Sequence, residues 1–481
     1  MNEESVKVLL VNTNQMKPPV VPVALDYLAY ALKRGHFGVE LLDLCFAADV
    51  ASAIDHFLAQ NSVSAIAVTL RNTDDCHFGG QEFFIPRFKE IIDRLKAKTS
   101  APLVLGGAGF SVMPEAILEY CGLDLGIWGE GEYSLPLLLR RIVAGEDYHQ
   151  VPGLVYRVGK SFSRNRPRYL KLEDMPSPER STVDNRRYYE EGGTGAIETK
   201  RGCAQSCIYC ADPLGKGRRV RCRSPQSVAD EIAALLEMGV EHFHLCDSEF
   251  NLPPAHARDI CVEIIKRGLG NKVRWYAYCS PGPFDEELAV LFQKAGCAGV
   301  DFGADSGTDF MLRTLGRNFT VEDLARTAQI CHRHGLVFMY DLLLGGPGET
   351  RESLRATIGT MKRLSPSRMG ASIGVRVFPG TKLASLVRKQ GSIAKNPNLQ
   401  GVVNENENFF APIFYLSSAL GADAAQYLAS LIAEDERFFS GFADAGNRDY
   451  NYNQNTVLVE AIKKGYRGAF WDILRRLSEG K

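Results

Sequence analysis

The sequence predicts an α/β chain that combines a doubly wound parallel sheet, an open partial barrel of six βα units and a C-terminal, mostly helical extension. Three observations carry this prediction. Strand and helix patterns alternate over residues 6–145 and again over 193–390, prolines interrupt the pattern between them, and the composition changes after residue 390. Continuous apolar strands that alternate with amphipathic helices are typical of parallel sheets buried on both faces.

Residues 1–145 are predicted to form the first unit, a doubly wound sheet. Its strands are expected at 6–12, 39–44, 65–70, 102–107 and 125–132, and its helices at 23–35, 84–98 and 114–121. Sheets of this kind bind ligands at the carboxyl ends of their strands. The candidate binding residues at those ends are Asn12, Asn14, Thr69, Leu70, Arg71, Gly106, Gly107, Gly129 and Glu130.

Residues 146–192 are predicted to be a linker, because four prolines interrupt a weak periodicity, although GLVYRVGKSFSRN suggests a small hairpin. Over residues 193–390 the alternation resumes with six strands, at 196–200, 240–247, 273–279, 299–305, 336–346 and 371–380. Six strands fall short of the eight of a closed barrel, so an open, partial barrel is expected.

The tail, residues 391–481, is rich in aromatic residues and asparagine and is expected to be mostly helical. Either a cap that faces the substrate or a plain packing extension would fit this composition. In the first case Tyr450, Asn451, Tyr452 and Asn453 would line a substrate pocket, whereas turns exposed to solvent explain them equally well.

The composition excludes several classes of protein. The chain has 481 residues, of which 45% are hydrophobic and 23% charged, and a net charge of −1, so global disorder and a general electrostatic affinity for nucleic acid or anionic membranes are not expected. It contains no run of 18 apolar residues and begins with an acidic segment, which predicts no membrane span, no signal peptide and a cytoplasmic location. Nine of its 12 cysteines are scattered singly, as expected of thiols in a reducing compartment.

The remaining cysteines, Cys203, Cys207 and Cys210, form a CxxxCxxC motif in a glycine-flanked loop directly after the first barrel strand. Three thiolates in one loop can bind three irons of a [4Fe-4S] cluster and leave the fourth iron open to a small molecule. A structural zinc site needs four ligands, usually in two separated pairs, and the nearby Cys222 and two histidines lack that spacing. The motif therefore favours an iron–sulfur cluster.

With the aromatic Tyr209 before its last cysteine, this loop resembles the signature of the radical S-adenosylmethionine (radical SAM) superfamily, and the barrel that follows is similar to that of the superfamily. The resemblance implies that the open iron binds S-adenosylmethionine. An external one-electron donor such as flavodoxin or ferredoxin then drives its cleavage to a 5′-deoxyadenosyl radical. It also implies contacts to S-adenosylmethionine from Tyr209 and from residues at the strand ends, namely Asp247, Ser248, Glu249, Asp305, Ser306, Gly346 and Arg376.

The first unit resembles the Rossmann-like cobalamin-binding domain that is fused to one large class of these enzymes. The resemblance rests on the helix at 22–35, on GGAGFSVMPEAIL (106–118) and on GIWGEGE (126–132), and it implies that the strand-end residues named above bind cobalamin. A generic Rossmann-like domain or a nucleotide site is the alternative, although a GxGxxG fingerprint after the first strand is absent.

One motif in the first unit could mislead. Asp75-Cys-His77-Phe-Gly-Gly80 matches the DxHxxG pattern by which some cobalamin domains offer a histidine to cobalt, but it follows the third strand rather than the first. We therefore do not expect His77 to bind cobalt, and we expect Arg71 and Asn72 to lie near the corrin instead.

The resemblance implies a cobalamin-dependent radical SAM enzyme, and the favoured reaction is methylation of an unactivated carbon via methylcobalamin. The alternatives are a non-methylating cyclase or rearrangement enzyme, a methylthiotransferase, and a non-enzymatic cobalamin or redox sensor. Thr13 and Asn14 stand where methylthiotransferases carry a cysteine after the first strand, and a sensor has no need of an open iron. The substrate, whether small molecule, lipid or peptide, is left unidentified, and no nucleic-acid partner is expected.

Overall fold

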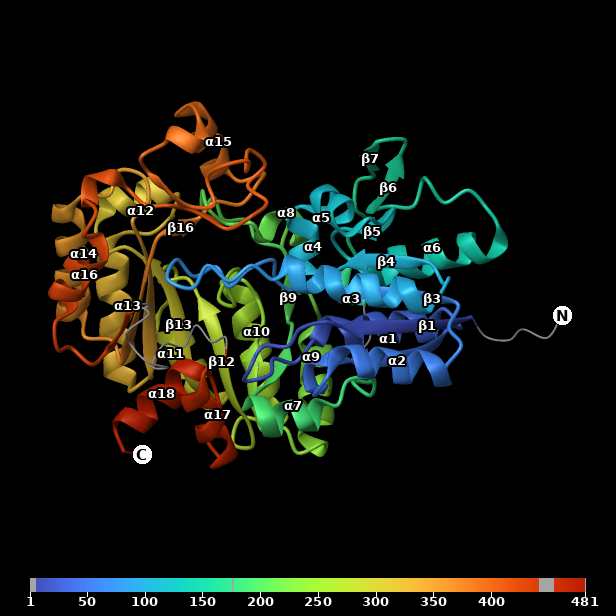
Figure 1. Cartoon of the computed structure of the whole chain (residues 1–481). Coiled ribbons are helices and arrows are strands. Elements are labelled where there is room, and N and C mark those ends of the chain that lie inside the picture. Colours follow the sequence, from blue (N-terminus) through green and yellow to red (C-terminus); the bar gives the residue numbers. More distant parts are fainter. Residues whose placement is uncertain (1–5, 175–176, 441–453, 481) are drawn as a thin grey trace.

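The computed structural model describes residues 6–174, 177–440 and 454–480, which form two α/β units lying side by side (Figure 1). The first unit holds a seven-stranded sheet in the order β2-β1-β3-β4-β5-β6-β7, with β1–β5 parallel and the β6–β7 hairpin antiparallel. Its strands are β1 (Lys7–Asn12), β2 (Gly38–Asp43), β3 (Ala65–Thr69), β4 (Leu103–Gly106), β5 (Leu125–Ile127), β6 (Leu154–Val158) and β7 (Ser161–Arg164). Its helices are α1 (Val23–Arg34), α2 (Val50–Gln60), α3 (Ile85–Lys98), α4 (Ala108–Val112), α5 (Pro114–Cys121) and α6 (Gly131–Ala144).

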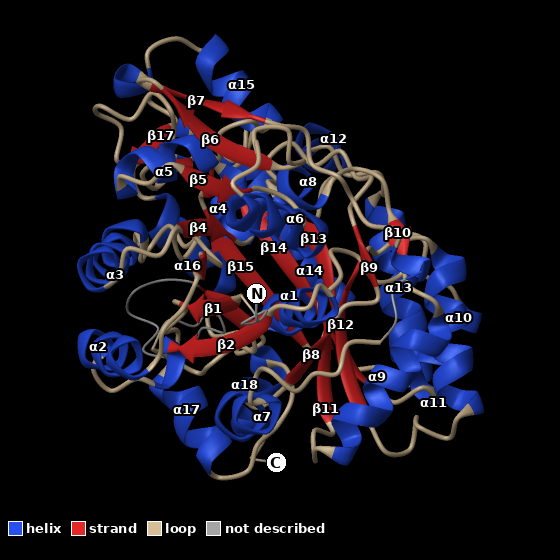
Figure 2. Cartoon of the chain, turned by 90° about the vertical axis from the view of Figure 1, so that its right-hand side faces the viewer, coloured by secondary structure: helices blue, strands red, loops and turns tan. Residues whose placement is uncertain are grey.

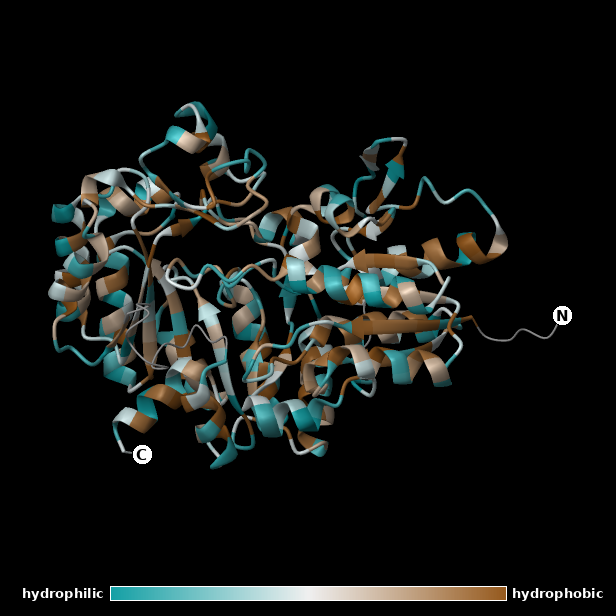
Figure 3. Cartoon of the chain, in the orientation of Figure 1, coloured by the Kyte–Doolittle hydropathy of each residue, from teal (hydrophilic) through white to brown (hydrophobic). Residues whose placement is uncertain are grey.

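The doubly wound sheet is confirmed, and its strands are apolar because both faces are covered. In β1 all side chains from Val8 to Val11 are fully buried: Leu9 and Val11 pack on one face of the sheet, and Val8 and Leu10 on the other. Figure 3 shows the strands of this unit as hydrophobic and the helices around them as mixed in character. The predicted hairpin exists and extends this sheet, so the sheet continues beyond residue 145 into the predicted linker.

The second unit is an open barrel sheet in the order β19-β15-β14-β13-β12-β11-β8, with every pair of neighbours parallel. The strands are β8 (Gly195–Ile197), β11 (His242–Leu245), β12 (Arg274–Cys279), β13 (Cys297–Asp305), β14 (Phe338–Leu344), β15 (Arg368–Ile373) and β19 (Phe438–Ser440). The helices that follow them are α9 (Pro225–Glu237), α10 (Pro254–Lys266), α11 (Glu286–Lys294), α12 (Asp309–Leu315), α13 (Val321–His334) and α14 (Arg351–Leu364). Figure 2 shows α9, α10, α11 and α13 along the outer side of this sheet.

All six barrel strands that the sequence predicts are present, and the tail supplies the seventh, β19, which pairs with β15. The tail contains three α-helices, but helices cover less than half of its described residues, and it also adds β17 and β18, which pair with β16 in a small antiparallel sheet. Strands of three residues carry too little periodicity to be seen in a sequence. The bounds in this region are β16 (Val375–Arg376), α15 (Lys382–Lys389), β17 (Leu399–Gly401), β18 (Ile413–Tyr415), α16 (Ala424–Ile432), α17 (Thr456–Lys463) and α18 (Phe470–Ser478).

The remaining elements join these units. They are α7 (Asn185–Gly192), β9 (Lys200–Arg201), α8 (Asp212–Lys216), β10 (Arg221–Cys222) and four short 3-10 helices at Leu44–Phe46, Leu172–Asp174, Ile393–Lys395 and Ser418–Leu420. Helices α17 and α18 lie against the end of the barrel opposite α15 (Figure 1). None of the helices in the described part of the chain combines the length and the apolar character needed to cross a bilayer.

Candidate functional site

The three cysteines of the motif lie together in the loop between β9 and α8, at the end of the barrel that faces the first unit. The loop is tied down by backbone hydrogen bonds from Cys203 N to Gly217 O (3.1 Å) and from Ile208 N to Leu315 O (3.0 Å). Gly202 precedes it with a φ of +88°, and a Cβ there would lie 2.2 Å from the carbonyl oxygen of Arg219, so only glycine fits.

The cysteine triad fits an iron–sulfur cluster better than a single metal ion. All three thiols are half-buried and unpaired by disulfides, and no group of His, Cys, Asp or Glu in the described residues is arranged to hold one ion. A cubane spreads its ligands more widely than a single ion does, because each thiolate binds a different iron. Arg317 donates a hydrogen bond to Cys207 Sγ (3.0 Å) and supplies positive charge beside the loop. Burial raises the pKa of Cys210 to about 12, so binding of iron must displace its proton.

The predicted S-adenosylmethionine residues surround this loop, and several are held by the scaffold. Tyr209 donates its hydroxyl to Asp305, which also pairs with Arg317. Asp247 accepts hydrogen bonds from Thr199, Ser306 exchanges one with Thr357 (3.0 Å), and Ser248 donates to Asp212 (2.8 Å). Gly346 packs against Leu315. The structure thus brings these residues to one end of the barrel, next to the three cysteines.

Arg376 behaves differently from the rest of this predicted group. Its guanidinium, nearly fully buried, pairs with Asp74 Oδ2 at 3.0 Å, and its plane lies over Phe378. Asp74 belongs to the loop after β3 of the first unit. The ion pair therefore joins the two units above the barrel mouth.

Glu249 is buried and is linked to the cluster loop through Arg317. Its Oε1 accepts from Arg317 (3.1 Å), whereas its buried Oε2 has no hydrogen-bond partner. Burial is the main cause that raises the pKa of Glu249, and Arg317 acts in the opposite direction. The guanidinium of Arg317 thus donates hydrogen bonds to both Glu249 and Cys207.

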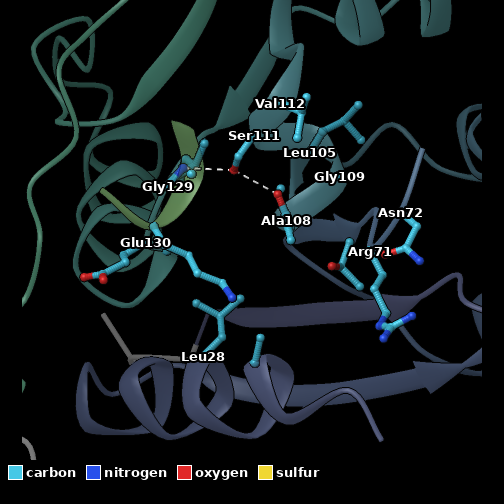
Figure 4. Close-up of a pocket in the computed structure, with 18 of the residues that line it drawn as sticks. Leu28, Arg71, Asn72, Leu105, Ala108, Gly109, Ser111, Val112, Gly129 and Glu130 are labelled. Carbon is cyan, nitrogen blue, oxygen red and sulfur yellow. Dashed lines mark hydrogen bonds between the residues drawn. The ribbon is translucent and has the colours of Figure 1, made fainter. Parts of the chain in front are cut away.

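A cavity of about 380 Å³ opens at the carboxyl ends of β3, β4 and β5 (Figure 4). Its deep end is apolar and lies between α1 and α6, where Leu25, Leu28 and Leu135 line it, and its rim is polar. A large flat ring with polar substituents and a nucleotide tail fits such a site, because the tail can enter the apolar slot while the substituents meet the rim. The chemistry of the residues that line the cavity thus agrees with cobalamin.

The predicted cobalamin residues divide into three groups. Those that line the cavity are Thr69, Arg71, Gly106, Gly107, Gly129 and Glu130. Asn14 and Leu70 line a smaller neighbouring hollow that Arg71 and Asn72 also border. Asn12 lies outside both, since its buried amide donates to Asp43 (2.8 Å) and Tyr188 (2.9 Å).

The glycines at the rim serve chain packing as well as ligand access. A Cβ on Gly107, whose φ is +103°, would lie 2.5 Å from the carbonyl oxygen of Leu70, and one on Gly109 would lie 2.9 Å from the carbonyl carbon of Asn72. Ser111 links the two sides, because its hydroxyl donates to Gly107 O (2.9 Å) and accepts from Gly129 N (3.0 Å), as Figure 4 shows. These contacts seat the turn after β4 against the loop after β3.

The cavity also has a barrel wall, which the sequence analysis did not assign. It is formed by Glu198, Arg201, Ala211, Asp212, Gly215, Lys216 and Phe378. Arg201 pairs with Glu132 (2.6 Å), and Arg221 pairs with Glu130 (2.5 Å), so ion pairs hold the wall to the first unit. The sequence does show charged residues on both sides of the cysteine loop, but only the topology shows that they face the first unit.

The candidate pocket residues of the tail lie outside the described residues. They are Tyr450, Asn451, Tyr452 and Asn453.

Glu349, in the turn after β14, provides a pH-dependent test of the fold. Burial raises its pKa from 4.5 to about 7, while hydrogen bonds from the backbone of Gly345 and Gly346 act in the opposite direction. Between pH 4.5 and 7 the folded state holds a proton that the unfolded state has lost, so stability falls as pH rises through this window, by about 3 kcal/mol in total. We expect Glu349→Gln to raise the Tm at pH 8 and to leave it nearly unchanged at pH 4.5. Equal shifts at both pH values would contradict the assignment.

Comparisons with known proteins agree with this geometry. Residues 9–139 match the model of the B12 binding domain, and residues 197–361 match that of the radical SAM superfamily. The chain is 32% identical to tryptophan 2-C-methyltransferase of Streptomyces laurentii, over 96% of this chain and 95% of that protein. It is 28% identical to an anaerobic magnesium-protoporphyrin IX monomethyl ester cyclase of Cereibacter sphaeroides, over 64% of this chain and 55% of the cyclase.

A solved structure of the radical S-adenosylmethionine methyltransferase TsrM from Kitasatospora setae, with tryptophan substrate and a SAM analog bound, superimposes with a TM-score of 0.92. The two chains are 34% identical, and the match covers 99% of this chain and 98% of that one. These similarities confirm the resemblance drawn from the cysteine loop and from the first unit. The chain therefore belongs to the family of cobalamin-dependent radical SAM methyltransferases, enzymes whose cofactors are a [4Fe-4S] cluster, S-adenosylmethionine and cobalamin.

Proposed function

We propose that this enzyme transfers a methyl group to a ring carbon of tryptophan or of a closely related indole amino acid. The relatives that match over their whole length support this substrate, since one is named for methylation of tryptophan and the other was solved with tryptophan bound. The cyclase relative is matched over little more than half its length, and no feature of the described residues favours ring closure over methyl transfer.

The observation that carries the proposal is the meeting of the cluster loop with the cobalamin cavity. Ala211 and Asp212, the two residues directly after Cys210, line that cavity. A methyl carrier in the cavity and S-adenosylmethionine at the cluster would therefore share one chamber at the barrel mouth. Transfer between two cofactors and a substrate requires this proximity.

When bound, the cluster would supply reductive cleavage of S-adenosylmethionine, and cobalamin would carry the methyl group. The chain's own residues bind and orient these groups. Arg317 offsets the negative charge of the thiolates, and Asp212 anchors the loop through Ser248 and Lys216 (3.1 Å). Because Asp212 lies in the wall between loop and cavity, it couples the position of one cofactor to that of the other.

The barrel interior offers aromatic walls to an indole. Tyr278 is 46% exposed, and its ring lies 4.8 Å from that of His244. Burial lowers the pKa of His244 to about 4, so the ring is neutral at physiological pH and adds no charge to the wall. At the opposite end Tyr276 donates to Asp472 (2.8 Å) and meets Trp471 edge to face, which closes the barrel.

The proposal is tested by supplying the anaerobically reconstituted enzyme with tryptophan and S-adenosylmethionine labelled at the methyl group. Iron and cobalt are measured on the same sample, so that loading of the cofactors is known. Labelled methyltryptophan is the expected product. A fully loaded enzyme that leaves tryptophan unlabelled would show that the substrate is wrong.

The enzyme is also proposed to act in the cytoplasm, with a flavodoxin or ferredoxin as its electron donor. Assays in which one of these proteins replaces the chemical reductant would test this donor.

His77 provides a second test of the cobalamin site. Its Nδ1 accepts a hydrogen bond from Gly80 N (3.0 Å), and the residue does not line the cavity, although Cys76 before it does. We expect His77→Ala to leave the affinity for cobalamin and the electron paramagnetic resonance spectrum of its cobalt(II) form unchanged. Arg71→Ala, at a residue that borders the cavity, should weaken binding. Loss of an axial nitrogen splitting in the His77 variant would show that the histidine binds cobalt after all.

A further inference from the structure

The cluster loop has an inner side and an outer side. Ala211 and Asp212, on the inner side, line the cobalamin cavity. Ala204 and Ser206, which lie between the first two cysteines of the motif, are exposed to solvent and form the outer side. Another protein can therefore approach the cysteines from the outer side, because the inner side belongs to the cofactor cavity.

Three cations on two separate segments surround this outer side. Arg218 donates a hydrogen bond to the carbonyl oxygen of Gln205 (3.3 Å), and Lys382, the first residue of α15, donates one to the carbonyl oxygen of Ser206 (3.5 Å). Arg219 follows Arg218, and its backbone carbonyl packs against Gly202, just before the first cysteine. Figure 1 shows α8 and α15 at the same end of the barrel. The side chains of Arg218, Arg219 and Lys382 are all exposed, and we call these three residues the basic patch.

The positive charge of the basic patch is not offset by neighbouring acids. Among the described residues, no carboxylate forms an ion pair with any of its three cations. The acid of the loop segment, Asp212, pairs with Lys216 at 3.1 Å, and the interior acids Glu249 and Asp305 are buried and pair with Arg317. Since the whole chain carries a net charge of −1, the patch is a local excess of positive charge rather than part of a basic protein.

We propose that the basic patch is the docking surface for a small acidic one-electron carrier protein, of the flavodoxin or ferredoxin kind, that reduces the cluster. The carrier loses one electron and the cluster gains it, and no bond is formed or broken. Electron transfer slows steeply with distance, so the carrier must dock close to the cysteines, and the outer side of their loop is open to it. Transient redox complexes have small interfaces, and complementary charge brings such partners together quickly. This inference rests on the proposed function for the need of a carrier, but it claims in addition where the carrier docks and through which residues.

The experiment measures binding of oxidised flavodoxin to the fully loaded enzyme by calorimetry, at low and at high ionic strength and without tryptophan. The patch variant replaces all three cations of the basic patch by glutamine. A second variant is Arg219→Gln alone, because the Arg219 side chain has no hydrogen-bond or ion-pair partner among the described residues and its loss should not disturb the loop. The matched control replaces three exposed cations at the amino end of the barrel by glutamine: Lys272, Arg274 and Lys294.

We expect the patch variant to bind flavodoxin about 10-fold more weakly than the wild type at an ionic strength of about 20 mM, and the difference to shrink at about 0.5 M, where salt screens the charges. Arg219→Gln should weaken binding by a smaller factor, and the control should bind like the wild type. A second measurement follows reduction of the cluster by reduced flavodoxin and by titanium(III) citrate. The patch variant should slow reduction by flavodoxin and leave reduction by the small chemical reductant unchanged.

Three outcomes would overturn the inference. The patch variant binds flavodoxin as tightly as the wild type, or the control weakens binding as much as the patch variant does, or the affinity of the wild type is insensitive to salt. If the patch variant is reduced more slowly by both reductants, its loop is damaged and Arg219→Gln decides: the inference stands if this variant slows reduction by flavodoxin alone, and falls if it does not.

These measurements also separate the inference from the proposed function, because neither contains tryptophan. If flavodoxin docks on the patch but tryptophan is not methylated, the docking surface stands and the proposed substrate falls. If the enzyme methylates tryptophan with titanium(III) citrate and the patch variant binds flavodoxin normally, the substrate stands and the docking surface falls. A wild-type enzyme that neither binds flavodoxin nor methylates tryptophan overturns both.

Discussion

Cys203→Ala is expected to lose the iron–sulfur cluster and, with it, all detectable methyl transfer. Three thiolates bind three irons of the cluster, and the two thiolates that remain in this variant cannot hold the cluster in the loop. Cobalamin binding should survive, because Cys203 is not among the residues of the first unit and of the barrel that line the cavity. Iron analysis should therefore fall from about four irons per chain to near zero, while cobalt stays at about one.

Cys222→Ala is the matched control for this prediction. Cys222 is a half-buried thiol on β10, close to the loop, and it is the cysteine that a zinc site would recruit as a fourth ligand. The cluster interpretation predicts that its removal leaves iron content and activity intact. Loss of metal from Cys222→Ala, or a full complement of iron in Cys203→Ala, would contradict the assignment of the triad.

The sequence was sufficient for the cluster site because its chemistry is local. Three cysteines within eight residues must lie together in any fold, so spacing alone placed them. The alternation of strands and helices in both units was also predictable, since apolar runs alternate with amphipathic segments along the sequence. By the same reasoning the polar strand ends of the first unit led to six residues that line the cavity.

The sequence failed where partners are distant along the chain. Asn12 lies at a strand end like the other candidates, but its side-chain amide donates a hydrogen bond to Tyr188, 176 residues later, and does not line the cavity. Arg376 follows a barrel strand, yet its partner Asp74 belongs to the other unit, 302 residues earlier.

The buried ionic network around Arg180 is a further feature that no local pattern indicates, and it leads to the largest expected effect on stability. The Arg180 side chain is fully buried and bonds Asp26 of α1 (2.9 Å), Glu231 of α9 (2.6 Å) and the carbonyl oxygen of Ala196 on β8 (2.9 Å). The guanidinium of this linker residue is thus bonded to both the first unit and the barrel. Arg223 completes the charge balance by pairing with the second oxygen of Glu231.

Arg180→Met is expected to lower the free energy of unfolding by about 3–5 kcal/mol, because it leaves two buried carboxylates with one cation between them. Chemical denaturation should show this loss, together with separate transitions for the two units. Adding Asp26→Asn restores neutrality and should recover part of the stability, so the two changes are not additive. Arg186→Met, which breaks an exposed pair with Glu190 on α7, is the control and should leave the transition unchanged. If Arg180→Met unfolds like that control, the network does not hold the two units together, and the ion pairs of Arg376 and Arg201 must do so instead.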